Sequence, residues 1–221
     1  MEVAKMKRFL SFFSIIAVVS LTIPQAHASL IVRGVDDMGN QLIYDTDFDI
    51  TWYDFTNSGD TWYNQVNWAD SLTVNFSGTT ISDWRLPTAL NQDGTGPCLG
   101  FNCTDNEMGH LYYDELGNSA GGPLNTIFLD GISGTAESFQ NLLADRYWTG
   151  TAHTGNPDYM YNFYFDSGLL GDWHYYANPY YGIAVFDGDV IAAPESTPIL
   201  LFASGLVVIF LNRRRIKKTI A

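Results

Sequence analysis

Apolar and polar positions along the middle of the chain form short strand-like runs and two helical patterns. The strand-like runs are apolar or aromatic and are bounded by Asp, Asn, Gly or Pro, which is typical of β-strands. They lie at residues 30–33, 41–44, 50–53, 147–151, 159–165, 173–177 and 183–186. In the run from 159 to 165 every second residue is aromatic, so this strand is expected to have one aromatic face.

Two stretches in the first half have the period of a helix. Asp60 can cap the first stretch, and residues 104–107 fit a capping box before the second, which ends at Gly117, where a left-handed cap is expected. The apolar faces consist of Trp62, Val66, Ala69 and Leu72, and of Met108, Leu111, Tyr112 and Leu116. The pattern predicts one α+β domain, with helices in the first half and a twisted antiparallel sheet in the second.

Residues 1–28 have the pattern of a secretory signal peptide. A basic start is followed by an apolar run at 9–23 and by a small-x-small cleavage site at 26–28. Cleavage there makes Ser29 the first residue of the mature protein. The alternative is an uncleaved anchor, but the apolar run is short for a membrane span and ends at Pro24.

Residues 194–221 form a second address segment. Pro194 and Glu195 precede an apolar stretch that predicts a short transmembrane helix at about 198–212, followed by a basic tail at 213–218. The tail contains Arg213, Arg214, Arg215, Lys217 and Lys218. Its positive charge is expected to stay on the cytoplasmic side of the membrane.

The order of Pro-Glu pair, short apolar helix and terminal Arg cluster resembles the PEP-CTERM sorting signal of Gram-negative bacteria. Ser196 stands where the pattern usually has a second Pro. The resemblance implies processing by an exosortase, a membrane transpeptidase-like Cys protease, and export to the envelope or the extracellular polymer matrix. An ordinary tail anchor is the alternative.

Charge is unevenly distributed along the chain. Residues 29–193 hold 22 of the 24 Asp and Glu but only three of the 11 cations, namely Arg33, Arg85 and Arg146, so their formal charge is −19 against −13 for the whole chain. Nucleic acid is excluded as a partner because its binding depends on clustered cations. The same charge argues against an anionic polysaccharide as ligand, unless the arginines cluster or a divalent cation bridges the protein and the polysaccharide.

The most specific string of the domain follows its first helical pattern. It comprises Asp83, Trp84, Arg85, Leu86, Pro87 and Thr88. Pro87 is expected to end a strand, and Thr88 to cap a short helix that begins at Ala89. Arg85, beside Trp and Pro at a strand end, is expected to pair with carboxylates and carbonyls rather than with a ligand.

Six further short sequence motifs precede or follow Trp84–Thr88 along the chain. They lie at residues 42–45, 50–52, 68–70, 107–113, 147–151 (with Tyr147 and Trp148) and 188–190. Together they resemble the Lcl C-terminal domain family over about residues 40–190. The resemblance implies a C-type-lectin-like or formylglycine-generating-enzyme-like fold and, from the adhesin of that family, binding of sulfated polysaccharide, with no established catalytic activity. Residues 184–187 replace the usual Val-Arg, so one cation of the family is missing.

Candidate chemistry beyond these strings is limited. Cys98 and Cys103 are expected to form a disulfide in an exported protein, and a copper-binding or redox pair is the alternative. Glu107 and His110 could both reach a metal from one helix, but two ligands do not make a zinc site. Aspartates at 36, 37, 45, 47 and 49 suit Ca²⁺, yet they lack the EF-hand spacing, so a solvated acidic surface is the main interpretation and no cofactor is assigned.

The sequence therefore predicts a non-enzymatic, exported envelope or matrix protein. Its parts are a signal peptide (1–28), an Lcl-type lectin-like ectodomain (29–193) and a sorting signal (194–221). The expected partners are an exosortase, the membrane and a polysaccharide or other surface ligand, which a few of the 28 aromatic residues of the ectodomain could bind by stacking on sugars. The alternatives are an acidic matrix component without a specific ligand and an oxidase-like enzyme.

Overall fold

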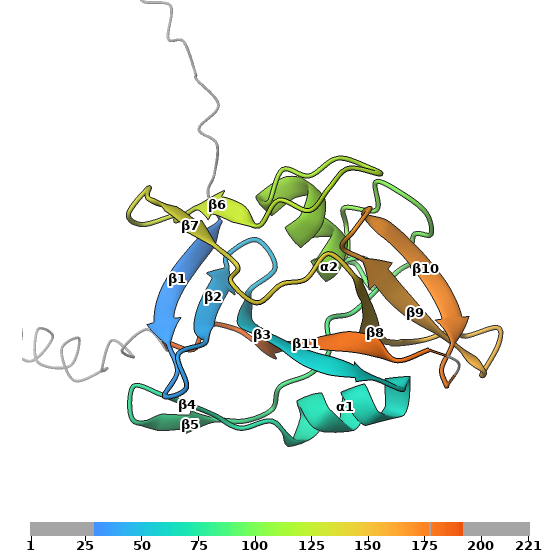
Figure 1. Cartoon of the computed structure of the whole chain (residues 1–221), viewed down its shortest axis with the longest axis horizontal. Coiled ribbons are helices and arrows are strands. Elements are labelled where there is room, and N and C mark those ends of the chain that lie inside the picture. Colours follow the sequence, from blue (N-terminus) through green and yellow to red (C-terminus); the bar gives the residue numbers. More distant parts are fainter. Residues whose placement is uncertain (1–28, 177, 192–221) are drawn as a thin grey trace, which may run out of the picture.

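Strands from both halves of the chain form one large sheet in the computed structural model, which describes residues 29–176 and 178–191. The strands are β1 (Leu30–Val35), β2 (Gln41–Asp45), β3 (Ile50–Asp60), β8 (Arg146–Ala152), β9 (Tyr159–Tyr164), β10 (Leu169–His174) and β11 (Tyr180–Asp187). Their order across the sheet is β1-β2-β3-β11-β8-β9-β10 (Figure 1). Neighbours are antiparallel except β11 and β8, which run parallel and pair only at Tyr181 and Tyr147.

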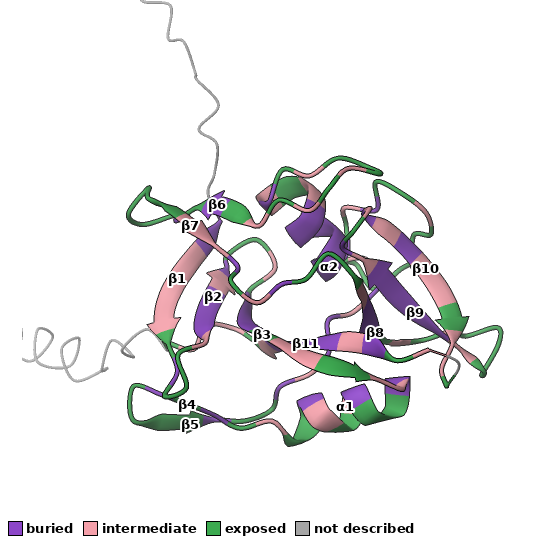
Figure 2. Cartoon of the chain, viewed as in Figure 1, coloured by how far each residue is buried: buried purple, intermediate pink, exposed green. Residues whose placement is uncertain are grey.

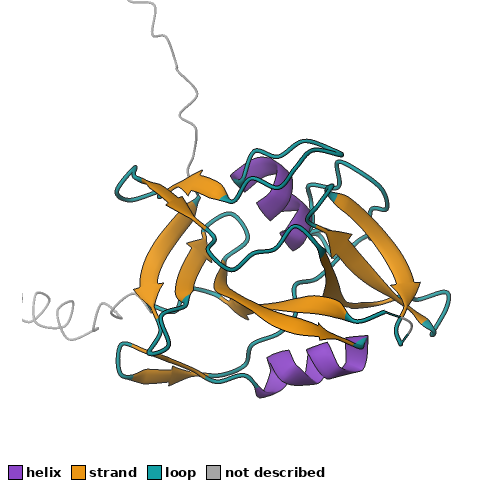
Figure 3. Cartoon of the chain, viewed as in Figure 1, coloured by secondary structure: helices purple, strands orange, loops and turns teal. Residues whose placement is uncertain are grey.

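Helices contribute little to the described residues (Figure 3). They are α1 (Trp62–Ser71) and α2 (Glu107–His110), which continues as the π-helical turn η1 (Leu111–Glu115). Two small hairpins complete the elements, β4 (Val74–Phe76) with β5 (Thr79–Ile81), and β6 (Ile127–Leu129) with β7 (Ala136–Ser138).

The prediction of an α+β domain of C-type-lectin-like or formylglycine-generating-enzyme-like type is wrong, because the described chain is mostly sheet. The second helical pattern forms only four α-helical residues before the hydrogen bonding changes register. In addition, β1, β2 and β3 from the first half join β8–β11 in the same sheet rather than leaving that half to helices.

Each face of the sheet packs against its own hydrophobic core. Trp52 and Tyr147 belong to the core that contains α2, whereas their neighbours Tyr53 and Trp148 belong to the core that contains α1. Figure 1 shows α1 and α2 on opposite sides of β3 and β11, and Figure 2 shows buried residues in both helices and in these strands. Burial on both faces explains why these strands read as continuous apolar runs.

Close contact between α1 and the sheet depends on glycine in β11. A Cβ at Gly182 would lie 2.3 Å from Oε1 of Gln65 and 3.1 Å from the Trp68 ring, both on α1. Gln65 is fully buried and donates hydrogen bonds to the carbonyls of Ser58 and Tyr180. The helix is therefore held by polar contacts as well as by its apolar face.

Of the residues predicted to cap the two helices, one is confirmed and two predictions are wrong. Gly117 has φ +63°, which confirms the expected left-handed residue after the second helix. The predicted capping box is wrong, since the Asn106 side chain accepts the first-turn hydrogen bond, from the Gly109 amide. The predicted cap at Asp60 is also wrong, because Asp60 accepts from the Thr61 amide just before α1, and Thr61 makes no side-chain cap.

No helix among the described residues is long and apolar enough to cross a membrane. The predicted transmembrane helix at 198–212, the Pro194-Glu195 pair and the tail with Arg213, Arg214 and Arg215 lie outside the described residues, as does the signal peptide.

Candidate functional site

The 84–88 segment fills the fork where β8 and β11 separate. Arg85 exchanges two backbone hydrogen bonds with Val185 of β11, and the Gly150 amide of β8 donates to the carbonyl of Pro87 at 2.8 Å. A Cβ at Gly150 would lie 3.1 Å from the Leu86 carbonyl, so glycine allows this close approach. The segment therefore bonds to both diverging strands.

The Arg85 guanidinium is neutralised by two carboxylates. It lies 2.6 Å from Oε1 of the buried Glu107 and 2.6 Å from Oδ1 of the exposed Asp187. Burial alone would lower the pKa of Arg85, but the bonds to Glu107 and Asp187 outweigh it and raise the pKa. Glu107 also accepts the Thr88 amide at 2.8 Å. An incoming anion thus finds this cation already paired.

The other predicted motif residues serve the core. Trp84, Leu86, Pro87, Tyr147 and Trp148 are all buried. The helix expected after Thr88 is absent from the described chain, where Thr88 instead shares a hydrogen bond with Thr151 at 3.0 Å.

The two cysteines are joined to each other. Cys98 and Cys103 form a disulfide, which confirms the predicted pairing. Both cysteines of the chain are used in this bond, so neither offers a thiol for copper or redox chemistry.

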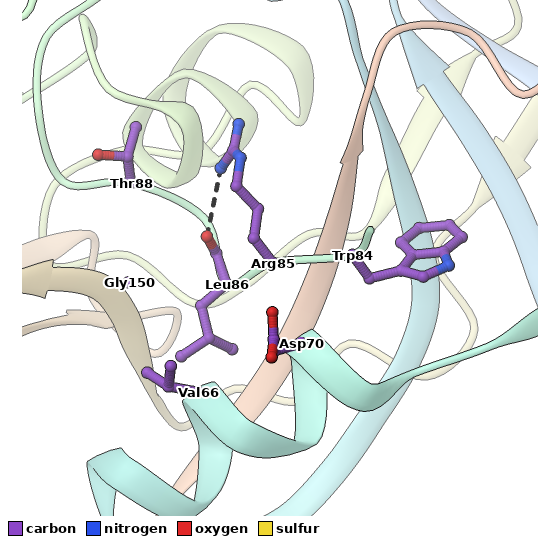
Figure 4. A pocket seen from close by; sticks show the side chains of 7 residues that line it. All are labelled: Val66, Asp70, Trp84, Arg85, Leu86, Thr88 and Gly150. Atoms are coloured by element: carbon purple, nitrogen blue, oxygen red, sulfur yellow. Dashed lines mark hydrogen bonds between the residues drawn. The ribbon is translucent and has the colours of Figure 1, made fainter. Parts of the chain in front are cut away.

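The segment also lines a surface pocket of about 300 Å³, called here the Arg85 pocket (Figure 4). Its lining residues are Val66, Asp70, Trp84, Arg85, Leu86, Thr88 and Gly150. Figure 4 shows the Arg85 guanidinium directed to the Leu86 carbonyl, 3.2 Å away. Arg85 and Thr88 are engaged within the protein, which leaves the exposed Asp70 as the polar group available to a ligand.

A second pocket, of about 220 Å³, lies between the β1–β2 turn, β3 and α1 and is called here the Phe55 pocket. Its lining residues are Asp36, Asp37, Met38, Tyr53, Phe55, Trp68, Leu72, Thr73, Val74 and Asn75. The Phe55 ring stacks on Tyr53 with centroids 5.7 Å apart and lies 6.2 Å from Trp68. Phe55 is 36% exposed, so this aromatic surface is open to solvent.

Polar groups of two kinds stand beside these rings. Asp36 is structural, since its carboxylate accepts the Tyr53 hydroxyl at 2.6 Å and the amides of Met38 and Asn40. Burial would raise the pKa of Asp36, but these hydrogen bonds outweigh it and lower the pKa, so the group is ionised. Asp37 is exposed, and within the described residues its carboxylate accepts no hydrogen bond. It is therefore available to a ligand.

Sequence patterns did not single out the Phe55 pocket. The strand at 50–53 was expected to end at Tyr53, whereas β3 continues to Asp60 along β11 after β2 has ended. This continuation exposes Phe55 beyond the edge of β2. The alternation of aromatic residues at 53 and 55 was the signal that could have indicated it.

The remaining predicted groups are dispersed. Asp36 and Asp37 lie at one end of the β1–β2 pair, and the aspartates at 45, 47 and 49 lie at the other, so the five do not form one calcium site. Glu107 pairs with Arg85 rather than with His110. Arg33 is paired with Asp189 at 2.6 Å, and Arg146 lies over the Tyr164 ring at 4.4 Å.

Comparisons of the chain with models of known protein families, with curated proteins and with solved structures found no match.

Proposed function

We propose that this protein is an exported, non-enzymatic envelope or matrix protein that binds a neutral glycan in the Phe55 pocket. The observation that carries the proposal is the partly exposed Phe55 ring beside Trp68, with the available Asp37 carboxylate at the rim. The negative face of an aromatic ring attracts the polarised C–H groups of a sugar. The carboxylate accepts hydrogen bonds from sugar hydroxyls.

The size of the pocket favours one sugar ring. Pockets for drug-sized ligands measure roughly 300–1,000 Å³, and the Phe55 pocket is smaller, at about 220 Å³. A single sugar of a longer chain, with the rest of the chain outside, fits this volume.

Charge favours a neutral ligand over a sulfated one. Residues 29–193 carry a formal charge of −19, and Arg33 and Arg85 are each paired with carboxylates. Sulfate groups would be repelled at low ionic strength. These charges argue for a neutral glycan as the ligand.

Export is supported by the two address segments. A mature protein that starts at Ser29 and is held at the envelope by its apolar C-terminal segment, or released by an exosortase, places the pocket where extracellular polysaccharide occurs. The mass and terminal sequences of the protein from envelope and medium fractions test this part. A chain retaining Met1, or recovered from the cytoplasm, would contradict it.

Binding is tested on the full-length protein with a glycan array, followed by calorimetry with the best neutral oligosaccharide. Asp37→Ala and Phe55→Ala should each weaken binding at least about tenfold, the equivalent of one lost contact of about 1.4 kcal/mol. The matched control is Tyr176→Ala, which removes a 62% exposed ring outside the pocket and should bind like the wild type. Melting temperatures verify that each variant is folded.

A second candidate is an acidic matrix component without a specific ligand. The observation that favours it is the absence of Lys from residues 29–193 together with their 22 acidic groups, which can be bridged by divalent cations. An array that is blank with and without Ca²⁺, while deletion of the protein still weakens matrix cohesion, would favour this candidate over glycan binding.

A further inference from the structure

A buried histidine faces two buried carboxylates at the end of β2, on the face of the sheet covered by α2. His110 Nε2 lies 3.1 Å from Oε1 of Glu115 and 3.9 Å from Oδ1 of Asp45. One possible ligand atom from each of the three residues lies within 4.8 Å of the others. Asp45 is fully buried, and the side chains of His110 and Glu115 are 10% and 8% exposed.

The π-helical turn brings His110 and Glu115 together. In an α-helix the side chain that lies above residue i is at i+4, whereas η1 has the wider register, in which the Leu116 amide donates to the Leu111 carbonyl five residues earlier. The wider turn places Glu115 on the side of His110. Such turns occur frequently at functional sites.

Two polar atoms in this cluster lack the hydrogen bonds that buried atoms normally have. Within the described residues, Nε2 of His110 and Oδ2 of Asp45 have no hydrogen-bond partner. Oε1 of Glu115 lies 3.1 Å from Nε2 and accepts the hydroxyl of Ser29. Oδ1 of Asp45 accepts the amides of Asp47 and Phe48, so Oδ2 is the oxygen left for another partner.

The other ring nitrogen of His110 is already held by a carboxylate. Nδ1 lies 3.3 Å from Oδ2 of Asp114, the residue four positions further along the chain. A hydrogen bond from Nδ1 to a carboxylate is the usual support of a metal-binding histidine, because it leaves the lone pair of Nε2 for the ion. The same contact orients the ring, which also packs against Phe48, with the two ring centroids 4.6 Å apart.

We propose that Asp45, His110 and Glu115 bind one divalent transition-metal ion of the zinc type. One imidazole nitrogen and two carboxylate oxygens are a ligand set that suits zinc. Ligand atoms about 2.0–2.2 Å from a tetrahedral ion are about 3.3–3.6 Å apart. Oε1 of Glu115, at 3.1 Å from Nε2, is close to this range, and Asp45 offers Oδ2, the oxygen that accepts no amide. The fourth position is left to water. The ion links the end of β2 to the end of η1.

Calcium fits this set poorly, since it takes six to eight oxygen ligands. The metal-free alternative is a protonated His110 among the carboxylates of Asp45, Asp47, Asp114 and Glu115. Burial would lower the pKa of His110, but Glu115, Asp45 and Asp114 outweigh it and raise the pKa. Burial also raises the pKa of Asp45 to about 6. Zinc and the proton therefore compete for the same site.

Zinc binding is measured on the full-length protein, purified without a histidine tag and stripped with a chelator. Calorimetric titration with zinc chloride should give one ion per chain, and the heat should depend on the buffer because bound protons are released. At a zinc concentration about 100 times Kd, the melting temperature should rise by about 5–10 °C. The same titration with calcium chloride should give no binding at this site.

Variants locate the ion. Glu115→Gln and His110→Gln should each weaken zinc binding at least about tenfold. Glu115→Gln preserves the shape of the side chain, so it tests the site even if the His110 variant does not fold. The control His174→Gln changes a histidine outside the cluster and should bind like the wild type. The proposal is overturned by a wild-type protein that binds no zinc, by calcium binding in its place, or by unchanged affinity in Glu115→Gln.

Discussion

Asp130 shows how one carboxylate can hold an edge of the sheet. Its oxygens accept the amides of Val32, Ile132 and Ser133 and the hydroxyl of Ser133. Val32 belongs to β1, an edge strand, and the contact lies where the β1–β2 register shifts. The turn between β6 and β7 therefore covers backbone groups that an edge strand would otherwise leave unpaired.

The stability provided by Asp130 should depend on pH. Burial would raise the pKa of Asp130, but its hydrogen bonds outweigh it and lower the pKa below the ordinary 3.8. A lowered pKa in the folded state gives stability that is present above pH 4 and is lost as the pH falls through the folded pKa. Asp130→Asn should lower the free energy of unfolding at pH 7 by about 1–3 kcal/mol, and the difference from the wild type should shrink below about pH 3.8.

Urea unfolding at pH 7 and pH 3 measures this difference. The control is Asp166→Asn at an exposed position, which should change the free energy of unfolding by less than about 0.5 kcal/mol. An Asp130→Asn variant as stable as the wild type at pH 7, or one with the same deficit at both pH values, would show that the carboxylate does not hold the edge.

At the scale of elements, the 84–88 segment joins β8, β11 and α2. Removal of Arg85 leaves Glu107, which is 5% exposed, without its cationic partner, whereas removal of Asp187, 73% exposed, leaves Arg85 paired with Glu107. The two ion pairs of one guanidinium are therefore expected to differ widely in their contribution to stability.

Thermal and urea unfolding of two variants tests this difference. Arg85→Met should lower the free energy of unfolding by about 3 kcal/mol, the cost of an unpaired buried carboxylate. Asp187→Asn should lower it by less than about 1 kcal/mol. Equal losses in the two variants would mean that Glu107 is not stabilised by Arg85.

The strands could be predicted from the sequence because each apolar run is bounded by turn residues, and all seven predicted runs overlap a strand. The β4–β5 hairpin was missed because its strands have three residues each and one of the three in β4 is Asn75. Its turn did carry a signal in the sequence, namely Gly78, because Ser77 and Gly78 both adopt the positive φ of a type I′ hairpin turn, which favours glycine.

The candidate sites depend on pairing that a one-dimensional pattern does not contain. Helical spacing grouped His110 with Glu107, but the π-helical turn brings His110 to Glu115 instead, and Asp45 comes from a strand 65 positions away in the numbering. Phe55 reaches solvent because β3 extends beyond the last residue of β3 that pairs with β2. Neither the helix register nor the relative strand lengths follow from residue types alone.

For the whole molecule, charge and shape lead to the same class of ligand. The sheet is buried on both faces, so most aromatic residues serve the two cores, and Phe55 is among the rings left exposed. Around that ring the protein presents carboxylates but few unpaired cations. A glycan that binds by stacking and hydrogen bonds, without charge, is compatible with this surface.

The most direct test of neutral-glycan binding in the Phe55 pocket is calorimetric titration of the full-length protein with matched neutral and sulfated oligosaccharides. The titration is done at low and at physiological ionic strength. The account predicts that the neutral oligosaccharide binds, that its affinity is the same at both ionic strengths, and that Asp37→Ala weakens it at least about tenfold. Tighter binding of the sulfated oligosaccharide at low ionic strength, or undiminished binding by Asp37→Ala, would contradict it.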